Sequence, residues 1–387
     1  MRVGLNAYFV HHRHTGSASY LRHLVRALRE VVPDLELKLY VPVGSGAPPD
    51  PGAWLEMAPG CSLAFISVPG WARGQWPKLL FEQVLFPRAA LADGCQVLHV
   101  PYFAPPLVGA GQTVATVHDV IPLLLPQYHR RLLPRAYNWL ISAAARRARL
   151  LIADSCWTLR DAVQLLPVPA RRVRVVHLAV SDAYRPVSDP GGMNAVRARY
   201  HLPMSYLLYL GGFDRRKGVD ALLRAYARLR NRVAEAPALV LAGRLPEAES
   251  EALLDPRPVI GKLGLAEHVR LVGDPAEEDK PALYSGCLAF VFPSVYEGFG
   301  LPPLEAMACG APVIACRAAS MPEVCGEAAL LVAPGDEREL ARAMEQASSD
   351  SRLREELSER GLCRASQFSW QETARKTAAV YREVTEH

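Results

Sequence analysis

The stretch with the most chemical potential runs from Phe292 to Ala315 and reads FPSVYEGFGLPPLEAMACGAPVIA. An apolar run closes it at each end, which predicts two buried strands. A glycine-containing loop followed by two prolines predicts a helix that begins near Leu301. The backbone N–H groups of Phe299, Gly300 and Leu301 would then lie at the positive end of that helix, where a phosphate or diphosphate anion binds favourably.

Two carboxylates, Glu297 and Glu305, flank this site with seven residues between them. Because Glu297 lies in the loop, we expect it to contact hydroxyl groups near a reacting centre. Glu305 lies within the first turns of the helix, where its oxygens can accept hydrogen bonds from a neutral diol such as a ribose. The alternative is that Glu297 is solvated and that Glu305 only complements the helix dipole.

A second cluster lies in the segment LGGFDRRKGVDALLRAY. Gly211 and Gly212 end a predicted strand, and Arg216 and Lys217 precede a predicted helix. Ligands of open α/β sheets bind beyond the carboxyl ends of the strands, so these two cations could balance the charge of a leaving diphosphate. Lys217 stands out because only six of the 44 basic residues are lysines. The alternative is a solvated basic turn.

Two weaker candidates lie in the first half of the chain. The segment TVATVHDVIP predicts a strand that ends at His118, which can contact a bound hydroxyl or be a structural histidine bonded to its own fold. Gly16, in HTGSAS, lets the backbone approach a phosphate. A helix start capped by Ser17 or Ser19 explains the same residues equally well.

Composition excludes several classes of protein. Half of the 387 residues are apolar, and the net charge of +5 is scattered along the chain, which argues against a nucleic-acid partner. The longest apolar runs are far below the roughly 20 residues that span a bilayer. Eight cysteines without a C-x-x-C pair favour reduced thiols in the cytoplasm. His11, His12 and His14 match no usual ligand spacing, so we expect neither a metal nor a cofactor.

Apolar runs alternate with helical patterns along the whole chain, which predicts an α/β protein with two doubly wound domains. The proline- and glycine-rich segment YRPVSDPGG predicts the boundary between residues 1–187 and 188–368. Residues 369–387 predict a helix that crosses back to the first domain. The predicted strands are Arg2–Ala7, Leu35–Val41, Gln96–Val100, Thr113–Val117, Leu150–Ala153, Arg174–His177, Tyr206–Leu210, Ala238–Ala242, Val269–Val272, Leu288–Phe292, Pro312–Ala315 and Ala329–Val332.

Together these motifs resemble the retaining nucleotide-sugar glycosyltransferases of family 4, which have the GT-B fold of two Rossmann-like domains facing each other across a cleft. The likeness covers nearly the whole chain. Its most specific part is the E-x7-E motif in YEGFGLPPLEAMACGAPVIA, supported by RRKG, HDVIP, PALYSGCLAFVFPS and SMPEVCGEAALLVAPGD. HDVIPLLLPQY and SMPEV resemble the mannosyltransferase-like members most closely.

The resemblance implies a role for each candidate residue. Arg216 and Lys217 would hold the donor diphosphate, Glu305 its ribose, and Glu297 with His118 the transferred sugar. Many relatives have an arginine five residues before the lysine, where this chain has glycine. The other donor contacts that the resemblance implies are glycine or loop positions, with the nucleobase mostly against backbone: Gly16, Gly212, Arg244, Leu245, Val272, Gly273, Phe299, Gly300 and Leu301.

The resemblance also implies hexose transfer with retention of configuration and without a metal, in which the leaving phosphate assists deprotonation of the acceptor. It favours GDP-mannose as the donor and leaves UDP-sugars open, with a glycan, a glycolipid or another small molecule as the acceptor. The basic and apolar segment NWLISAAARRARLL would allow a peripheral contact with the inner face of a membrane. A nucleotide-sugar epimerase of the same fold and a non-catalytic nucleotide-sugar-binding module remain alternatives.

Overall fold

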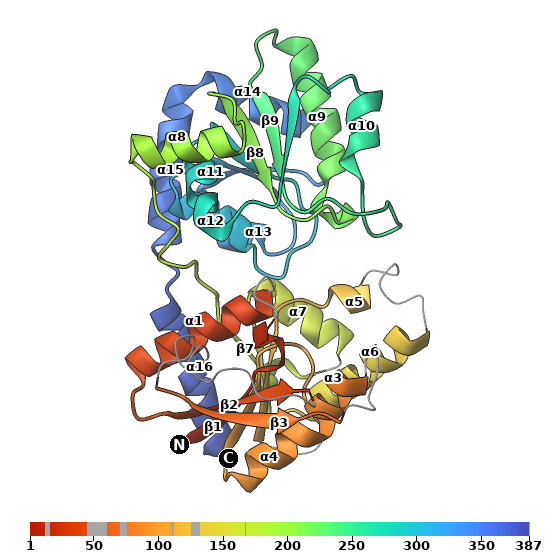
Figure 1. The fold of residues 1–387 in the computed structure, drawn as a ribbon, viewed down its shortest axis with the longest axis vertical. Coiled ribbons are helices and arrows are strands. Elements are labelled where there is room, and N and C mark those ends of the chain that lie inside the picture. Colours follow the sequence, from red (N-terminus) through yellow and green to blue (C-terminus); the bar gives the residue numbers. More distant parts are fainter. Residues whose placement is uncertain are drawn as a thin grey trace. The chain divides into compact units, whose positions relative to one another are not determined.

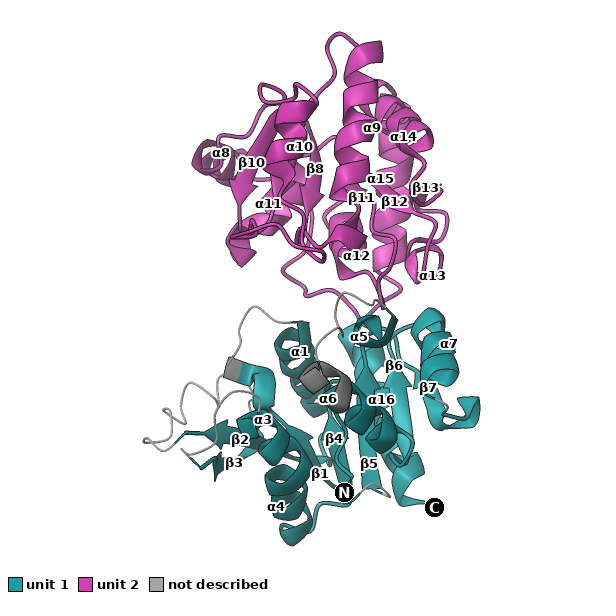
Figure 2. Ribbon diagram, turned by 90° about the vertical axis from the view of Figure 1, so that its right-hand side faces the viewer, with its two compact units in different colours: residues 1–178, 369–387 teal, residues 179–368 magenta. Residues whose placement is uncertain are grey.

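The structure is a computed structural model that describes residues 1–11, 16–44, 60–69, 76–107, 109, 112–124, 132–166 and 168–386. The chain divides into two compact units (Figure 2). Unit 1 comprises Met1–Leu178 and Ser369–His387, and unit 2 comprises Ala179–Phe368. Each unit contains one parallel sheet with helices packed on it (Figure 1).

The division between the units precedes the boundary predicted at residue 187, and the segment YRPVSDPGG is not wholly a linker. Its last residues begin helix α8 (Pro190–Arg199) of unit 2. The Asp189 carboxylate accepts hydrogen bonds from the N–H groups of Gly191 and Gly192, and Pro190 occupies the first turn. An Asp cap followed by proline is typical of a helix start. The two glycines made the segment resemble a linker in the sequence.

The sheet of unit 1 has the strand order β3-β2-β1-β4-β5-β6-β7, and the paired strands are parallel. Because the order reverses between β1 and β4, this sheet is doubly wound. The central strands are short apolar runs buried on both faces. The strands are β1 (Arg2–Asn6), β2 (Glu36–Val43), β3 (Ser62–Ser67), β4 (Val97–Val100), β5 (Thr113–Val117), β6 (Leu150–Ala153) and β7 (Val173–Val175).

The C-terminal helix α16 (Trp370–Thr385) belongs to unit 1, where it packs beside α1 (Gly16–Val31) and against β4, β5 and β6 (Figure 1). The other helices of this unit are α3 (Trp76–Leu80), α4 (Phe86–Ala92), α5 (Ile121–Leu124), α6 (Leu132–Ala145) and α7 (Cys156–Leu165), with a π-helical turn at Phe81–Leu85 and 3₁₀ turns at Tyr8–His11 and Ala170–Arg172.

A buried line of polar side chains joins α16 to the sheet. The hydroxyl of Tyr381 lies 2.6 Å from Nδ1 of His99, and Nε2 of His99 lies 2.9 Å from Oγ1 of Thr116. The Thr116 oxygen lies 3.2 Å from the hydroxyl of Tyr20 on α1. Burial lowers the pKa of His99 to about 3, so its imidazole is neutral at physiological pH and bonds to neutral hydroxyls on both sides.

Unit 2 repeats this plan with the strand order β10-β9-β8-β11-β12-β13 and parallel pairing throughout. Helices α9 and α10 lie on one face of the sheet, and α11 and α12 lie on the other (Figure 1). The strands are β8 (Tyr206–Leu210), β9 (Ala238–Ala242), β10 (Val269–Gly273), β11 (Ala289–Phe292), β12 (Val313–Cys316) and β13 (Ala329–Val332). The helices after α8 are α9 (Val219–Arg232), α10 (Pro256–Lys262), α11 (Lys280–Ser285), α12 (Leu301–Ala308), α13 (Met321–Cys325), α14 (Glu337–Ser349) and α15 (Ser351–Ala365).

The predicted strands match observed ones to within two residues at each end, and the edge strand β3 was missed. Helix α1 begins at Gly16. Ser17 and Ser19 therefore lie inside α1 and do not cap it. None of the described helices is both long and apolar enough to span a bilayer.

We expect the variant Tyr381→Phe to destabilise the protein by about 1–3 kcal/mol, because it leaves Nδ1 of the buried His99 without a partner. Chemical unfolding at pH 7 measures the change. Thr385→Val on the exposed part of the same helix is the control and should cost less than about 0.5 kcal/mol. Equal stabilities of the two variants would show that this bond does not hold α16 in place.

Candidate functional site

Two loops of unit 2 meet beyond the carboxyl ends of β8 and β11, which are neighbours in the sheet at the point where the strand order reverses. After β8 the chain forms a single 3₁₀ turn at Arg215–Lys217, capped by the carboxylate of Asp214. The loop after β11 lies against this turn, because the N–H of Val295 donates to the carbonyl of Arg216 at 2.9 Å. The fold thus brings the two clusters predicted from sequence together.

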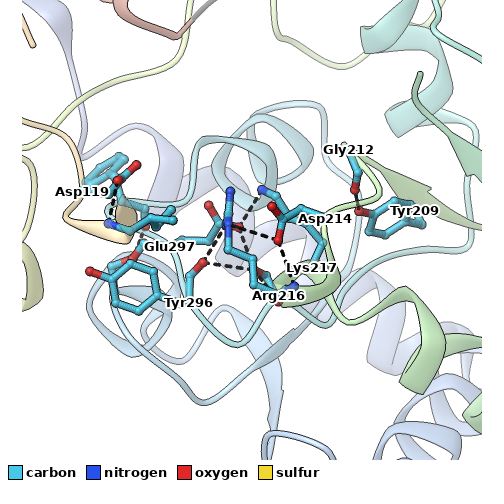
Figure 3. A network of polar contacts seen from close by, with 12 residues as sticks. Asp119, Tyr209, Gly212, Asp214, Arg216, Lys217, Tyr296 and Glu297 are labelled. Atoms are coloured by element: carbon cyan, nitrogen blue, oxygen red, sulfur yellow. Dashed lines mark hydrogen bonds and ion pairs between the residues drawn. The ribbon is translucent and has the colours of Figure 1, made fainter. Parts of the chain in front are cut away.

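The centre of the site is the carboxylate of Glu297 (Figure 3). Its Oε1 accepts hydrogen bonds from Nζ of Lys217 at 2.6 Å, Oγ of Ser294 at 2.7 Å and Nη1 of Arg216 at 2.9 Å. Nη1 of Arg216 also donates to the carbonyl of Tyr296 at 2.8 Å. Burial raises the pKa of Glu297, but Lys217 and Arg216 outweigh burial and hold the pKa below its ordinary value. Glu297 is therefore an ionised and largely buried carboxylate, with its side chain 13% exposed, and not a solvated surface group.

The two cations retain capacity to bind an anion. Nε of Arg216 is buried and has no hydrogen-bond partner, and it lies 3.7 Å from Oδ1 of Asp214, with which Arg216 forms an ion pair. The ammonium of Lys217 lies 5.0 Å from the centre of the Phe292 ring and is largely shielded from water. In such a shielded position, the attraction between these cations and a phosphate oxygen is stronger than it would be in bulk water.

Gly218 connects the basic turn to α9. Its φ is +71°, in the left-handed region, and a Cβ on this residue would lie only 2.3 Å from the carbonyl oxygen of Pro293. The glycine therefore allows the basic turn and the Glu297 loop to approach closely enough for their ion pairs.

We expect Gly218→Ala to destabilise the protein by more than about 2 kcal/mol, because the new methyl group is strained in φ and collides with backbone. Gly212→Ala is the matched control, since a Cβ there meets nothing within 4 Å, and its effect should stay below about 1 kcal/mol. Thermal and chemical unfolding of both variants provide the comparison. A Gly218→Ala protein as stable as the control would contradict the close approach.

The loop before α12 is fixed by hydrogen bonds from the side chain of Ser320. Helix α12 begins at Leu301, as the two prolines predicted. Gly300 precedes it with a φ of +113°, and the helix has no side-chain cap. Ser320 Oγ lies 2.9 Å from the carbonyl of Glu297 and 2.5 Å from that of Phe299, and the Phe299 side chain is buried. The positive end of α12 thus lies directly after the loop that carries Glu297.

Glu305 lies on α12 and accepts a hydrogen bond from the hydroxyl of Tyr284 at 3.0 Å. Burial raises the pKa of its carboxyl group to about 7, against the opposing influence of the Lys280 ammonium and of the Tyr284 and Tyr184 hydroxyls. The Glu305 side chain is therefore partly protonated near neutral pH. It does not lie in the exposed position that a simple helix-dipole role would give it.

The raised pKa of Glu305 has a predictable effect on stability. The folded state binds the proton more tightly than the unfolded state, so this carboxyl group lowers stability as pH rises from about 4.5 to about 7. We expect Glu305→Gln to be more stable than the parent protein by up to about 3 kcal/mol at pH 8, and by much less at pH 5. Unfolding curves at both pH values, with the exposed Glu356→Gln as control, measure this; a difference independent of pH would contradict it.

The remaining donor-site candidates of unit 2 lie along the same edge of the sheet. Arg244 is exposed and Leu245 is half-buried after β9, while Val272 and Gly273 end β10. Gly212 is exposed, and its carbonyl accepts a hydrogen bond from the hydroxyl of Tyr209 (Figure 3). These strand ends follow one another in the order β10-β9-β8, beside the Glu297 cluster.

The candidates of unit 1 are placed as follows. Nδ1 of His118 lies 2.7 Å from the carboxylate of Asp154, and Nε2 lies 3.1 Å from the carbonyl of Pro101. Burial lowers the pKa of His118, but Asp154 and the carbonyl outweigh burial and raise it, because both partners accept and thus favour the doubly protonated ring. Both ring nitrogens of His118 are therefore bonded within unit 1, as the interpretation of a structural histidine requires. Gly16 is the exposed first residue of α1, with open space where a Cβ would be.

Sequence reasoning missed Ser294, Ser320, Tyr284 and Asp154. Ser294 stands three residues before Glu297, so it could have been found from its place in the motif. Nothing in the sequence marks the others as partners. Among the described residues, no three His, Cys, Asp or Glu side chains gather as a metal site would require. His12, His14 and the side chain of His11 lie outside that description.

Comparison with known proteins now decides the family. Residues 14–184 match the model for "Glycosyltransferase Family 4", and residues 203–362 match that for "Glycosyl transferases group 1". The chain is 34% identical over 273 residues to the O-antigen chain mannosyltransferase B of Escherichia coli, and the match covers 70% of each protein. The chain belongs to the family 4 glycosyltransferases. The E-x7-E motif predicted this family, and the epimerase interpretation loses its support.

Two further comparisons cover nearly the whole glycosyltransferase. It is 29% identical to the MMP alpha-(1->4)-mannosyltransferase of Mycolicibacterium hassiacum, over 98% of both chains. Its fold matches the structure of Anabaena HepE in complex with UDP and glucose with a TM-score of 0.73 at 19% identity, covering 99% of this chain and 100% of that one. The predicted GT-B fold of two Rossmann-like domains is confirmed, as is the mannosyltransferase-like character of the relatives.

Proposed function

We propose that this glycosyltransferase transfers a mannosyl group from GDP-mannose to a saccharide acceptor, with retention of configuration at the anomeric carbon. The names of its relatives from Escherichia coli and Mycolicibacterium hassiacum support the mannosyl group. The UDP bound in HepE keeps a UDP-sugar as the alternative donor. The observation that carries the proposal is the buried Glu297 carboxylate with Arg216 and Lys217 as its partners.

The donor diphosphate is the group that suits these cations. Arg216 and Lys217 together carry two positive charges; Glu297 pairs with both cations, and Asp214 pairs with Arg216 at 3.7 Å. The diphosphate oxygens would accept hydrogen bonds from the Lys217 ammonium and from Nε of Arg216, which has no hydrogen-bond partner. As the bond to the sugar breaks, negative charge grows on the leaving phosphate, and these preorganised cations would stabilise it without reorganisation and without a metal.

When the diphosphate draws Arg216 and Lys217 away from Glu297, the Glu297 carboxylate would become free to bind the transferred sugar. An ionised carboxylate accepts hydrogen bonds, so Glu297 would bind hydroxyl groups of the transferred sugar once the cations have turned to the diphosphate. Ser294 would keep its orientation. The leaving phosphate would accept the proton of the attacking hydroxyl on the same face of the sugar, which requires no protein nucleophile and retains configuration.

Other parts of the donor would lie along the strand ends already described. Glu305 would accept hydrogen bonds from the ribose diol, and the backbone after β9 and β10 would contact the base. For His118 and Gly16 of unit 1, the donor contacts that the resemblance implies stay predictions. A peripheral membrane contact is supported by α6, where Trp139 is exposed, and by the exposed Arg146 and Arg147 that follow it.

We expect Arg216→Met and Lys217→Met each to lower the turnover number by a factor on the order of 10² to 10³, because each removes a charge that stabilises the leaving diphosphate. Arg215→Met is the matched control, since its guanidinium is exposed and donates to Glu249 and the carbonyl of Ser250. Steady-state kinetics with folding checked by thermal unfolding make the comparison. Full turnover in a folded Lys217→Met protein would remove Lys217 from the mechanism.

The donor is identified by a panel of GDP-mannose, UDP-glucose, UDP-N-acetylglucosamine, GDP and UDP. A nucleotide that binds only the folded state raises the unfolding temperature. Stabilisation by GDP and turnover of GDP-mannose are the expected results, and NMR of the product should show an α-mannoside. Stabilisation by UDP compounds alone would show that the donor is a UDP-sugar and not GDP-mannose. No response to any nucleotide would contradict the proposed function.

A further inference from the structure

The residue before helix α13 is a serine whose hydroxyl does not cap the helix. Ser320 occupies the cap position, where a serine oxygen usually accepts a hydrogen bond from an N–H of the first turn. The N–H groups of α13, all of which the structure describes, make no such bond. Oγ of Ser320 lies instead 2.9 Å from the carbonyl oxygen of Glu297 and 2.5 Å from that of Phe299. A carbonyl oxygen only accepts, so the Ser320 hydroxyl donates to these two oxygens, and the helix is left without a side-chain cap.

The residue before Ser320 is held in an unfavourable backbone conformation. Ala319 is buried and has a φ of +49°, in the left-handed region that residues with a side chain rarely adopt. Such conformations persist only where the surrounding contacts impose them, and they are most frequent at functional sites. An uncapped helix start next to a strained residue does not serve the local stability of α13. Contact with the Glu297 loop (residues 293–300) therefore determines the shape of this turn.

The same contact continues along the end of the Glu297 loop. Met321 packs against Gly300, because a Cβ on Gly300 would lie only 2.1 Å from Cε of Met321. The Phe299 side chain is buried, and its ring centre lies 5.7 Å from that of Phe368. Helix α13 itself lies beside α12 (Figure 1). The end of the Glu297 loop is thus packed against the start of α13, entirely within unit 2.

Glu297 is held from two sides, and the proposed function changes only one of them. Its carboxylate is bonded to Arg216, Lys217 and Ser294. In the proposed function the two cations turn to the donor diphosphate, and their bonds to Glu297 open. The bonds from Ser320 reach uncharged backbone oxygens, so a diphosphate does not compete for them. The loop therefore keeps this anchor at the stage when the carboxylate would bind the sugar.

We propose that Ser320 is a positioning residue of the donor site, which holds the Glu297 carboxylate toward the transferred sugar after its ion pairs with Arg216 and Lys217 have opened. Ser320 is completely buried and acts through the backbone of the Glu297 loop, so it does not itself contact the donor. The inference rests on the proposed function, because that function supplies the sugar as the partner of Glu297.

The test is isothermal titration calorimetry of the full chain with GDP and with GDP-mannose. Because Glu297 would contact the sugar and not the nucleotide, the Kd for GDP-mannose divided by the Kd for GDP reports how well Glu297 is placed. We expect Ser320→Ala to raise this ratio about tenfold, which equals about 1.4 kcal/mol and is the size of one hydrogen bond. The Kd for GDP itself should stay within about twofold of the parent value.

Ser285→Ala is the matched control. Oγ of Ser285 donates to the carbonyl of Cys309 at 3.1 Å, so this variant removes a side-chain-to-backbone bond at the other end of α12. It should lower the unfolding temperature, as Ser320→Ala does, and leave the ratio at the parent value. Ser320→Thr keeps the hydroxyl and should restore most of the ratio.

A double variant tests whether Ser320 acts through Glu297. Once Glu297→Ala has removed the carboxylate, adding Ser320→Ala should raise the ratio no further. An additive rise in this background, a parental ratio in Ser320→Ala, or an equal rise in Ser285→Ala overturns the inference.

Two further provisions keep the test decisive. If Ser320→Ala does not fold, Ser320→Cys takes its place, because a thiol of similar size is a much weaker donor and should raise the ratio in the same direction. If the nucleotide panel identifies a UDP-sugar as the donor, the same ratio is measured with UDP-glucose and UDP. Failure of the folded parent protein to bind any of these nucleotides contradicts the proposed function instead.

Discussion

The donor site depends on one interaction, the burial of the Glu297 carboxylate against the Arg216 guanidinium and the Lys217 ammonium. Charges out of water are stable only when each finds a close partner, so the two loops that carry them must meet at hydrogen-bond distance. Parallel pairing of β8 with β11 brings the loops to the same edge of the sheet. Gly218 then removes the side chain that would hold them apart.

The same constraint explains why both units place their unusual polar groups beyond strand ends. Strand interiors are apolar and buried on both faces, and where His99 and Thr116 enter the sheet they are bonded to neutral partners. A charged group that is to bind a ligand must stay partly accessible, and the side chain of Lys217 is 13% exposed. The carboxyl edge of a doubly wound sheet offers such positions in each unit.

The sequence determined most of the fold because its strands are short apolar runs with clear breaks. It failed at β3, whose partly buried edge position leaves a weak pattern, and at α8, where glycines after Asp189 and Pro190 resemble a linker. The E-x7-E motif and RRKG marked the residues of the candidate donor site because the residues within each motif are close in sequence.

Partners that are remote in sequence could not be predicted in this way. Asp154 stands 36 residues from His118, and only the pairing of β5 with β6 brings them together. A serine directly before a helix is typical of a cap, and only the packing of α13 against the Glu297 loop turns the Ser320 hydroxyl to the carbonyls of that loop. Burial decides the pKa of Glu305, so its raised value was equally hidden.

The measurement that tests the account most directly is a crystal structure of the chain with GDP bound. The account predicts that the diphosphate oxygens lie within hydrogen-bond distance of the Arg216 guanidinium and the Lys217 ammonium, and that both side chains have moved away from Glu297. A diphosphate bound elsewhere, with the Arg216–Glu297 and Lys217–Glu297 ion pairs unchanged, would show that these pairs only stabilise the fold.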